Sequence, residues 1–311
     1  MARTVRPKAP SETAAAPLDV GLVTAAYGRR YRVEPESGGE IDCVTRGRKS
    51  DIACGDRVRF AHTGGGVGVI EAIDQRSTLF YRSDAQRQKL IAANVTQIVI
   101  VVAVEPRFSE DLVNRCLAGA EHAEVGAVIA LNKMDLPGAQ NASDALELYR
   151  TLGYAVVPLI AKRELSPLKA HLAGHISVLV GQSGMGKSTM INGLVPEAAA
   201  RVAEISAALG TGRHTTTHAE LYHLDSSTHI IDSPGLQEFG LHHFTPDDAA
   251  RAFIEFQPFL GQCRFRNCRH TGEPGCAIAA ARVRGDIAEQ RLASYQRLAG
   301  ELARKREAWE T

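Results

Sequence analysis

The sequence of 311 residues predicts a multidomain fold: an N-terminal β-barrel, a central α/β domain and a C-terminal α-helical, zinc-binding domain. Three observations predict this division. Short β-like runs with glycine-rich turns fill residues 18–80, and strand-like and helix-like patterns alternate over residues 94–244. Within residues 245–311, three cysteines and one histidine lie inside a stretch of 14 residues, between two helical patterns.

The composition is that of an ordinary globular protein, with 44% apolar and 23% charged residues and a net charge of +1. Residues 1–91 hold 15 lysines and arginines against 11 aspartates and glutamates, so a local basic surface is expected there. No apolar run has the ~18 residues of a membrane span, and no apolar segment follows the basic N-terminus as in a secretory signal. Six cysteines do not suggest a disulfide scaffold in a chain of this length. We therefore expect a cytoplasmic protein with no membrane partner, and we take it to be a monomer.

Two segments lie outside the predicted domains. Residues 1–17 are rich in alanine, proline and threonine, carry three basic residues, and are expected to form a disordered basic arm. A frayed terminus without a function is the alternative for this arm. Residues 81–93 are expected to form a basic connector between the barrel and the α/β domain.

Five short β-like runs with no helical pattern among them predict a small closed barrel such as an OB-fold. Barrels of this kind often bind RNA with basic and aromatic side chains on one face, and Arg29, Arg30, Tyr31 and Arg32 provide such a cluster. A solvated charged rim on an inert barrel explains the same residues, so the barrel alone leaves RNA binding open. The five runs are residues 21–24, 31–33, 40–44, 57–60 and 68–73.

Residues 94–244 alternate between β-branched runs and helical patterns, which predicts a doubly wound α/β sheet. The run HISVLV at residues 175–180 is apolar enough for a buried parallel strand. The predicted strands are residues 95–104, 125–131, 154–160, 175–180, 219–224 and 229–232, and the predicted helices are residues 111–122, 143–152 and 166–173.

The segment GQSGMGKST at residues 181–189 matches the phosphate loop G-x-x-x-x-G-K-[ST] and lies between a predicted strand and a helical turn. Its glycines let backbone N–H groups approach phosphate oxygens, and the helix N-terminus adds partial positive charge. Lys187 is expected to reach the β- and γ-phosphates, and the Ser188 hydroxyl is expected to ligate Mg²⁺. A glycine-rich turn before an ordinary helix is the alternative. The residues expected to contact the nucleotide are Gly181, Gln182, Ser183, Gly184, Met185, Gly186, Lys187, Ser188 and Thr189.

The tetrapeptide Asn132-Lys133-Met134-Asp135 ends a predicted strand, where ligands bind in such sheets, and matches the guanine-reading motif N-K-x-D. The Asp135 carboxylate would accept hydrogen bonds from guanine N1–H and the 2-amino group, and adenine offers neither donor there. Hydrogen bonds to a charged group contribute ~1.5–3 kcal/mol each, which predicts discrimination of roughly two to three orders of magnitude. Asn132 would hold the guanine edge and neighbouring loops, and the Lys133 stem would cover the base. A strand-end turn is the alternative for this tetrapeptide alone.

Two further segments fit a nucleotide site. Asp232-Ser233-Pro234-Gly235 reads D-x-x-G, so we expect Asp232 to hold Mg²⁺ through water and the Gly235 N–H to contact the γ-phosphate. In the segment GRHTTTH at residues 212–218, a threonine hydroxyl would complete the Mg²⁺ shell, and we assign Thr216. On its own, D-x-x-G is usually explained by a strand-end turn, and GRHTTTH by a polar flexible loop.

The order of these motifs is unusual. N-K-x-D ends 46 residues before the phosphate loop, whereas ordinary GTPases have the phosphate loop first and N-K-x-D last. The sheet is therefore predicted to be circularly permuted. Residues 158–162 lie where the loop behind the base is expected, with the Ala161 N–H aimed at guanine O6 and Lys162 next to it.

Four residues in the C-terminal part follow the spacing C-x₄-C-x-H-x₅-C: Cys263, Cys268, His270 and Cys276. Three thiolates and one imidazole make a closed tetrahedral Zn²⁺ set with no open position for water, which predicts one structural zinc ion. Separate thiols without a metal are the alternative. Three arginines between the ligands would also present a basic surface suited to a phosphate backbone.

Together these motifs closely resemble one family, the circularly permuted GTPases that depend on the small ribosomal subunit (RsgA, also called YjeQ or EngC). The resemblance covers roughly residues 18–290, from the barrel through NKMD, GQSGMGKST, GRHTTTH and DSPG to the cysteine–histidine spacing. It implies an OB-fold, a permuted GTPase domain and a zinc domain, with GTP or GDP, Mg²⁺ and Zn²⁺ as ligands. It also implies that the protein binds the 30S subunit and its 16S rRNA, acts late in the maturation of that subunit, and is stimulated by it to hydrolyse GTP and leave. Ile160 departs from the family pattern, in which a serine often precedes the Ala-Lys pair.

The catalytic residue is less firmly indicated. Many GTPases place a water-orienting glutamine after D-x-x-G, and this chain has Leu236, which cannot orient water. The resemblance makes His214 the candidate, because a loop imidazole is a suitable base near neutral pH. A contact of His214 with RNA or solvent, with catalysis completed by the ribosome, stays open. Two other classes also stay open: a GTP-gated rRNA-binding module whose hydrolysis is incidental, and a P-loop ATPase or small-molecule kinase, against which NKMD predicts that ATP does not compete with GTP.

Overall fold

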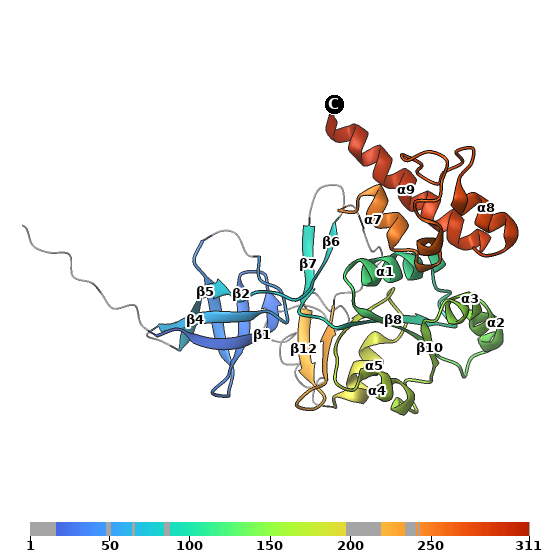
Figure 1. Cartoon of the computed structure of the whole chain (residues 1–311). Helices are drawn as coiled ribbons and strands as arrows, with labels where there is room; N and C mark the ends of the chain where they lie inside the picture. Colours follow the sequence, from blue (N-terminus) through green and yellow to red (C-terminus); the bar gives the residue numbers. More distant parts are fainter. Residues whose placement is uncertain are drawn as a thin grey trace, which may run out of the picture.

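The computed structural model describes residues 17–47, 51–63, 66–83, 88–196, 219–233, 241 and 243–310. A barrel of strands, a central sheet flanked by helices and a C-terminal group of helices follow one another along the molecule (Figure 1). None of the described helices is long and apolar enough to cross a membrane.

The N-terminal barrel has the strand order β1-β2-β3-β5-β4, and β4 pairs back to β1 so that the ring closes. Its core consists of side chains that point inward from alternate strand positions, such as Val23, Val33, Val58 and Phe60. The predicted OB-fold barrel is confirmed. Its strands are β1 Asp19–Tyr27, β2 Arg30–Pro35, β3 Ile41–Thr45, β4 Arg57–Thr63 and β5 Val67–Ile73.

The segment predicted to connect the barrel to the α/β domain contains a β-hairpin. Strands β6 Leu79–Ser83 and β7 Gln88–Ala93 pair in an antiparallel, two-stranded sheet of their own. A register shift between Phe80 and Tyr81 interrupts the pairing. Charged and amide side chains dominate this stretch of sequence, and they conceal the alternation that would have predicted strands.

The central sheet has the order β10-β9-β8-β11-β13-β12, with every neighbouring pair parallel except β13 and β12. Strand β8 is buried over its whole length, as a central parallel strand should be. Strand β12 also pairs with β1, which joins the barrel to this sheet. The bounds are β8 Gln97–Ala103, β9 Gly126–Asn132, β10 Ala155–Pro158, β11 Ile176–Val180, β12 Ala219–His223 and β13 His229–Asp232.

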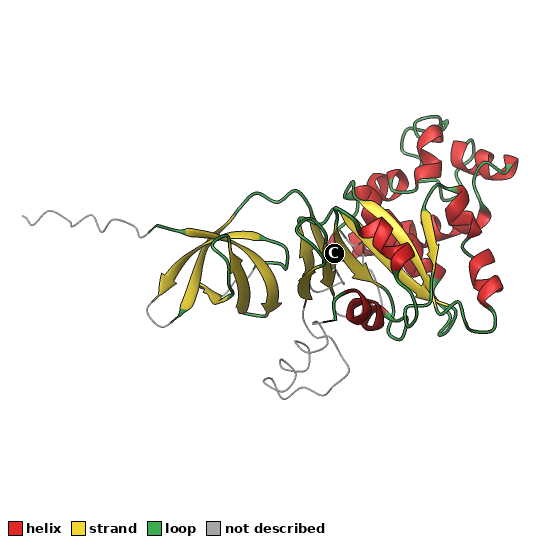
Figure 2. Ribbon diagram, turned by 90° about the horizontal axis from the view of Figure 1, so that it is seen from below, coloured by secondary structure: helices red, strands yellow, loops and turns green. Residues whose placement is uncertain are grey.

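Helices cover both faces of this sheet, as predicted for a doubly wound fold (Figure 2). Ile98, Ile100 and Val102 of β8 face the core that α1 Glu110–His122 completes. Val99 and Val101 face the core that α4 Ser166–Leu172 and α5 Lys187–Leu194 complete. The helix predicted over residues 143–152 is divided into α2 Ala139–Asp144 and α3 Glu147–Thr151, with the buried Leu146 between them.

The C-terminal helices pack on the same face of the sheet as α1 (Figure 1). Helix α7 Pro246–Arg251 begins with a capping box between Thr245 and Asp248, and the 3₁₀ helix η1 Ile254–Phe259 follows it. The long last helix, α9 Glu289–Glu310, corresponds to the second of the two helical patterns that flank the cysteines and the histidine. Helix α8 Ala277–Arg284 was not predicted, because its alanines and arginines form no apolar stripe in the sequence.

Candidate functional site

The topology brings three of the sequence motifs to one edge of the central sheet. Strand β9 ends at Asn132, β11 leads into the phosphate loop, and β13 ends at Asp232. Because β9, β8, β11 and β13 are parallel neighbours, their carboxyl ends meet at the edge where open α/β sheets bind ligands. The N-K-x-D strand therefore lies two places from the phosphate-loop strand, although it comes first in the chain.

The phosphate loop, residues 181–186, turns from β11 into α5 through glycines with positive φ. At Gly186, φ is 104°, and a Cβ atom there would lie 2.2 Å from the Asn132 Nδ2 atom, so only glycine fits this position. Helix α5 begins at Lys187 with no side-chain cap, which leaves its first N–H groups to an external acceptor. Ser183, Gly184 and Ser188 are exposed to solvent at this end of the helix.

Lys187 is held inside the phosphate loop. Its Nζ atom donates hydrogen bonds to the carbonyl oxygens of Gly181 at 2.6 Å and Gln182 at 3.1 Å. The side chain is largely buried, and burial lowers the pKa of Lys187, while the nearby Asp232 carboxylate acts in the opposite direction. Because a buried charge is costly unless it is paired, an anionic ligand would stabilise this ammonium group.

Asn132 connects the phosphate loop to the loop after β10. Its Nδ2 atom donates to the Met185 carbonyl oxygen at 2.9 Å, and its Oδ1 atom accepts from the Ala161 N–H at 2.9 Å. Asn132 is buried, so both bonds are protected from water. In this structure the Ala161 N–H holds the Asn132 side chain in place, and its contact with guanine O6 stays a prediction. Lys162, the next residue, is exposed.

Lys133 and Asp135 differ in how they are held. Lys133 has a left-handed backbone with φ of 62°, and its Nζ atom donates to the Glu105 carbonyl oxygen at 2.5 Å. Asp135 is exposed, and no described residue forms a hydrogen bond or ion pair with its carboxylate. This carboxylate is therefore available to a ligand at the sheet edge.

Asp232 lies at the end of β13 and is buried. The next residue, Ser233, is also buried and donates its hydroxyl to the Leu179 carbonyl oxygen at 2.9 Å, which ties the end of β13 to β11. Three predicted site residues lie outside the described residues: His214, Thr216 and Gly235.

Sequence reasoning missed the loop after β8, which packs against the phosphate loop. The Ser109 N–H donates to the Gln182 side-chain oxygen at 3.1 Å, and a Cβ atom added at Gly184 would lie 3.4 Å from the Pro106 ring. Ser109 is also the N-cap of α1. The sequence signal for this loop was the Ser-Glu-Asp start of a helix, but nothing in it pointed to the phosphate loop.

The four predicted metal ligands converge in the C-terminal part. All four ligand atoms lie within 4.8 Å of one another. The His270 Nδ1 atom is 3.5 Å from the sulfur of Cys263, 3.6 Å from that of Cys268 and 3.5 Å from that of Cys276. A tetrahedral ion with Zn–S of ~2.3 Å and Zn–N of ~2.0 Å would place sulfur and nitrogen about 3.5 Å apart, so the donor set fits zinc.

The backbone around this cluster supports the same geometry. The Ala277 N–H donates to the Cys263 sulfur at 3.3 Å, and His270 has a left-handed backbone with φ of 58°. The Tyr295 hydroxyl of α9 donates to the Arg269 carbonyl oxygen at 2.8 Å. The cluster is therefore fixed to the last helix.

A buried polar network joins α9 to α1. Arg291 is 1% exposed, bonds both carboxylate oxygens of Glu255, and donates to the Asn114 side-chain oxygen at 2.6 Å. The Asn114 amide donates to the Ser294 hydroxyl at 2.8 Å. This network attaches the helices of the C-terminal part to the helix that begins beside the phosphate loop.

A phosphate loop and an N-K-x-D segment at the carboxyl edge of a doubly wound sheet, in reversed chain order, define a circularly permuted P-loop nucleotide-binding protein. The model of the RsgA GTPase family matches residues 73–242 of this chain. A Nitrosospira multiformis protein named small ribosomal subunit biogenesis GTPase RsgA is 50% identical over 283 residues, which cover 91% of this chain and 90% of that protein. A Neisseria meningitidis protein of the same name is 49% identical over 284 residues, 91% of this chain and 92% of its own.

Solved structures agree with this match. The crystal structure of YjeQ from Thermotoga maritima has a TM-score of 0.71 and 30% identity, covering 92% of this chain and 99% of its own. The structure of YloQ, described as a circularly permuted GTPase, has a TM-score of 0.67 and 26% identity, covering 95% and 99%. The chain belongs to the RsgA GTPase family and is a GTP-hydrolysing enzyme.

Proposed function

We propose that this GTPase binds the small ribosomal subunit through its 16S rRNA, acts late in the maturation of that subunit, and leaves when GTP is hydrolysed. The observation that carries the proposal is the extent of the family match: relatives named for small-subunit biogenesis align over nine-tenths of the chain. The subunit would stimulate the hydrolysis. The protein would work in the cytoplasm as a monomer.

In this proposal GTP occupies the carboxyl edge of the central sheet. Asp135 would read the base and Lys187 would bind the phosphates, with Asn132 holding the two loops at a fixed separation. The two sides of the site are joined by buried hydrogen bonds at 2.9 Å, which supports a ligand that spans both. The proposed nucleotide-binding residues are Asn132, Lys133, Asp135, Ala161, Lys162, the phosphate loop from Gly181 through Thr189, and Gly235.

Mg²⁺ and Zn²⁺ would occupy two separate sites. Ser188, Thr216 and Asp232 would hold Mg²⁺, which neutralises charge on the β- and γ-phosphates when it is bound. Ser188 is exposed in the first turn of α5, after β11, and Asp232 ends the neighbouring parallel strand β13. Their hydroxyl and carboxylate oxygens suit an ion that prefers oxygen ligands. One structural Zn²⁺ would be held by the cysteine–histidine cluster.

His214 is the proposed catalytic residue, and the alternative is a GTP-gated rRNA-binding module whose hydrolysis is incidental. The deciding experiment measures GTP turnover with and without purified small subunits, for the unchanged protein and for His214→Ala. The proposal expects slow turnover alone, a rate increase of at least about tenfold with subunits, and loss of that increase in the variant with GTP affinity unchanged.

Two outcomes would count against the proposal. Unchanged stimulated turnover in His214→Ala would reject the histidine assignment. A hydrolysis-dead variant that still supports subunit maturation and leaves the particle would favour the RNA-binding module.

A further inference from the structure

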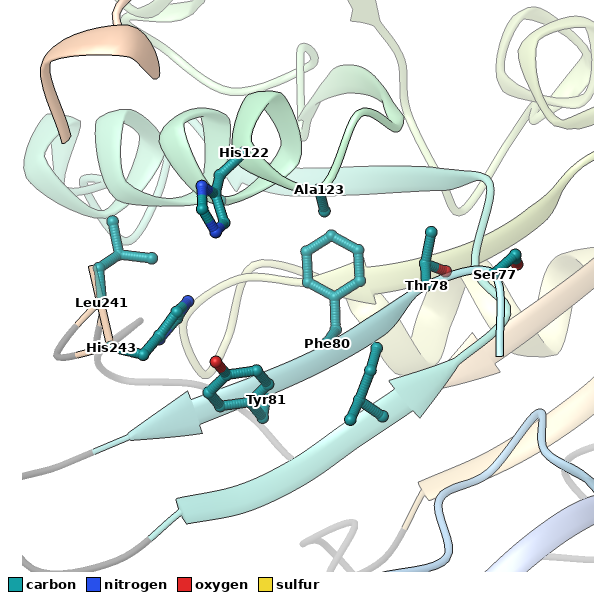
Figure 3. A pocket seen from close by; sticks show the side chains of 10 residues that line it. Ser77, Thr78, Phe80, Tyr81, His122, Ala123, Leu241 and His243 are labelled. Carbon is teal, nitrogen blue, oxygen red and sulfur yellow. The ribbon is translucent and has the colours of Figure 1, made fainter. Parts of the chain in front are cut away.

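A cavity of about 310 Å³ lies between the hairpin and the C-terminal end of α1, away from the phosphate loop (Figure 3). Strand β6 provides one wall, α1 provides the opposite wall, and Leu241 and His243 close one end. The side chains of Phe80, Tyr81, His122 and His243 all point into this space (Figure 3). No residue assigned to GTP, Mg²⁺ or zinc lines it.

The hairpin beside the cavity is irregular. Phe80 pairs with Ala92 and Tyr81 pairs with Leu90, so Ile91 of β7 is the extra residue of a β-bulge. Bulges increase the local twist of a strand pair and are frequent next to active sites.

Contacts among the rings hold the cavity walls. The Tyr81 and His243 rings lie 4.3 Å apart at 43°, and His122 lies 4.4 Å from the Phe244 ring at 42°. The His122 Nδ1 atom is 4.0 Å from an Asp248 carboxylate oxygen. The lining therefore combines π faces with imidazole and hydroxyl groups that donate or accept hydrogen bonds.

We propose that this cavity binds one unstacked nucleobase of an RNA chain. Its volume is at the lower end of the ~300–1,000 Å³ of ligand pockets, which suits a single heterocycle. RNA-binding proteins take up splayed-out bases by stacking them on aromatic and histidine rings and bonding their polar edges.

The choice of RNA over a protein partner rests on the proposed function, because the rings alone would also accept an aromatic side chain. The two proposals can still fail separately. The cavity residues are distinct from those assigned to GTP. Filling the cavity should therefore leave GTP turnover without subunits unchanged.

The test measures binding of a single-stranded RNA octamer that carries one 2-aminopurine, whose fluorescence falls when the base stacks on a ring. The full chain is titrated, and two variants are compared with it. Tyr81→Leu removes a stacking ring, and Ala123→Leu fills the cavity while keeping every ring. Phe265→Leu is the matched control, because it removes an exposed ring far along the chain from the cavity.

The proposal expects quenching by the unchanged protein and at least about fivefold weaker binding in both cavity variants, since stacking one base contributes a factor of this size or more. The control should bind as the unchanged protein does. Equal binding in all proteins, or an equal loss in Phe265→Leu, would overturn the proposal. It is also overturned if Ala123→Leu weakens binding to small subunits but not to the octamer, which would indicate a protein ligand. Subunit-stimulated GTP turnover, recorded in parallel, tests the proposed function separately.

Discussion

The phosphate-loop edge and the cysteine–histidine cluster are two ligand sites built in opposite ways. At the sheet edge, backbone N–H groups, glycines and one buried ammonium group face a space that stays open to solvent. In the cluster, four side chains converge on one point and leave no position for another ligand. The first design permits exchange of its ligand, and the second retains its ligand as part of the fold.

The two sites also differ in what holds them. Asn132 positions the phosphate loop through two buried hydrogen bonds, so this site exists before its ligand arrives. The cluster lies among turns and short helices with few apolar residues of their own. We expect it to depend on the metal for its structure.

Removal of a zinc-ligand side chain should therefore lower stability more than any other substitution proposed for the two sites. Structural zinc contributes on the order of 10 kcal/mol to small domains, which is comparable to the whole stability of a domain. Cys276→Ala should lose bound zinc and abolish amide-exchange protection in residues 263–285, while GTP still binds. Zinc content and hydrogen exchange measure this.

Cys116→Ala is the matched control, because Cys116 is equally buried but lies in α1, outside the cluster. It should keep its zinc and its C-terminal protection. Full protection in Cys276→Ala would show that packing on α1, rather than the metal, holds the C-terminal part together.

The pH dependence of the two sites should have opposite signs. Burial lowers the pKa of Lys187 from its ordinary value of 10.5, and phosphate binding requires the charged form, so binding raises that pKa again. GTP affinity should therefore fall as the pH rises through the lowered pKa of Lys187, which lies below its ordinary value of 10.5. Zinc should instead be lost on acidification, because thiolates and the His270 imidazole must be deprotonated to bind it.

Titrations of GTP binding and of bound zinc across pH check both signs. Lys187→Arg should remove the alkaline decrease, since guanidinium stays charged. An alkaline decrease of the same size in that variant would assign the effect to another group.

Both sites could be predicted from the sequence because each uses residue types that few other structures require. Glycine is required at position 186 because the Asn132 side chain passes beside it. Lys187 and the three cysteines follow motif spacings that are typical of phosphate-binding and zinc-binding sites. The barrel, the parallel sheet and the permuted order also followed from local patterns and their sequence order.

What could not be predicted are the contacts between distant segments. The hydrogen bond between Asn132 and Met185 joins residues that are 53 positions apart in the sequence. The hydrogen bond between Arg291 and Asn114 joins residues that are 177 positions apart. Likewise, no sequence pattern shows that the Ala161 N–H donates to the Asn132 side chain. Periodicity reports which face of an element is buried, but it does not identify the polar partner on the other side.

The central claim is that the open site at the sheet edge is selective for guanine through Asp135. The most direct test is calorimetric titration of GTP and ATP into the unchanged protein and into Asp135→Asn. We expect GTP to bind at least about 100-fold more tightly than ATP. The variant should lose most of this difference, because asparagine cannot accept both guanine donors with a full charge. Equal affinities for GTP and ATP in the unchanged protein, or an unaltered preference in the variant, would contradict it.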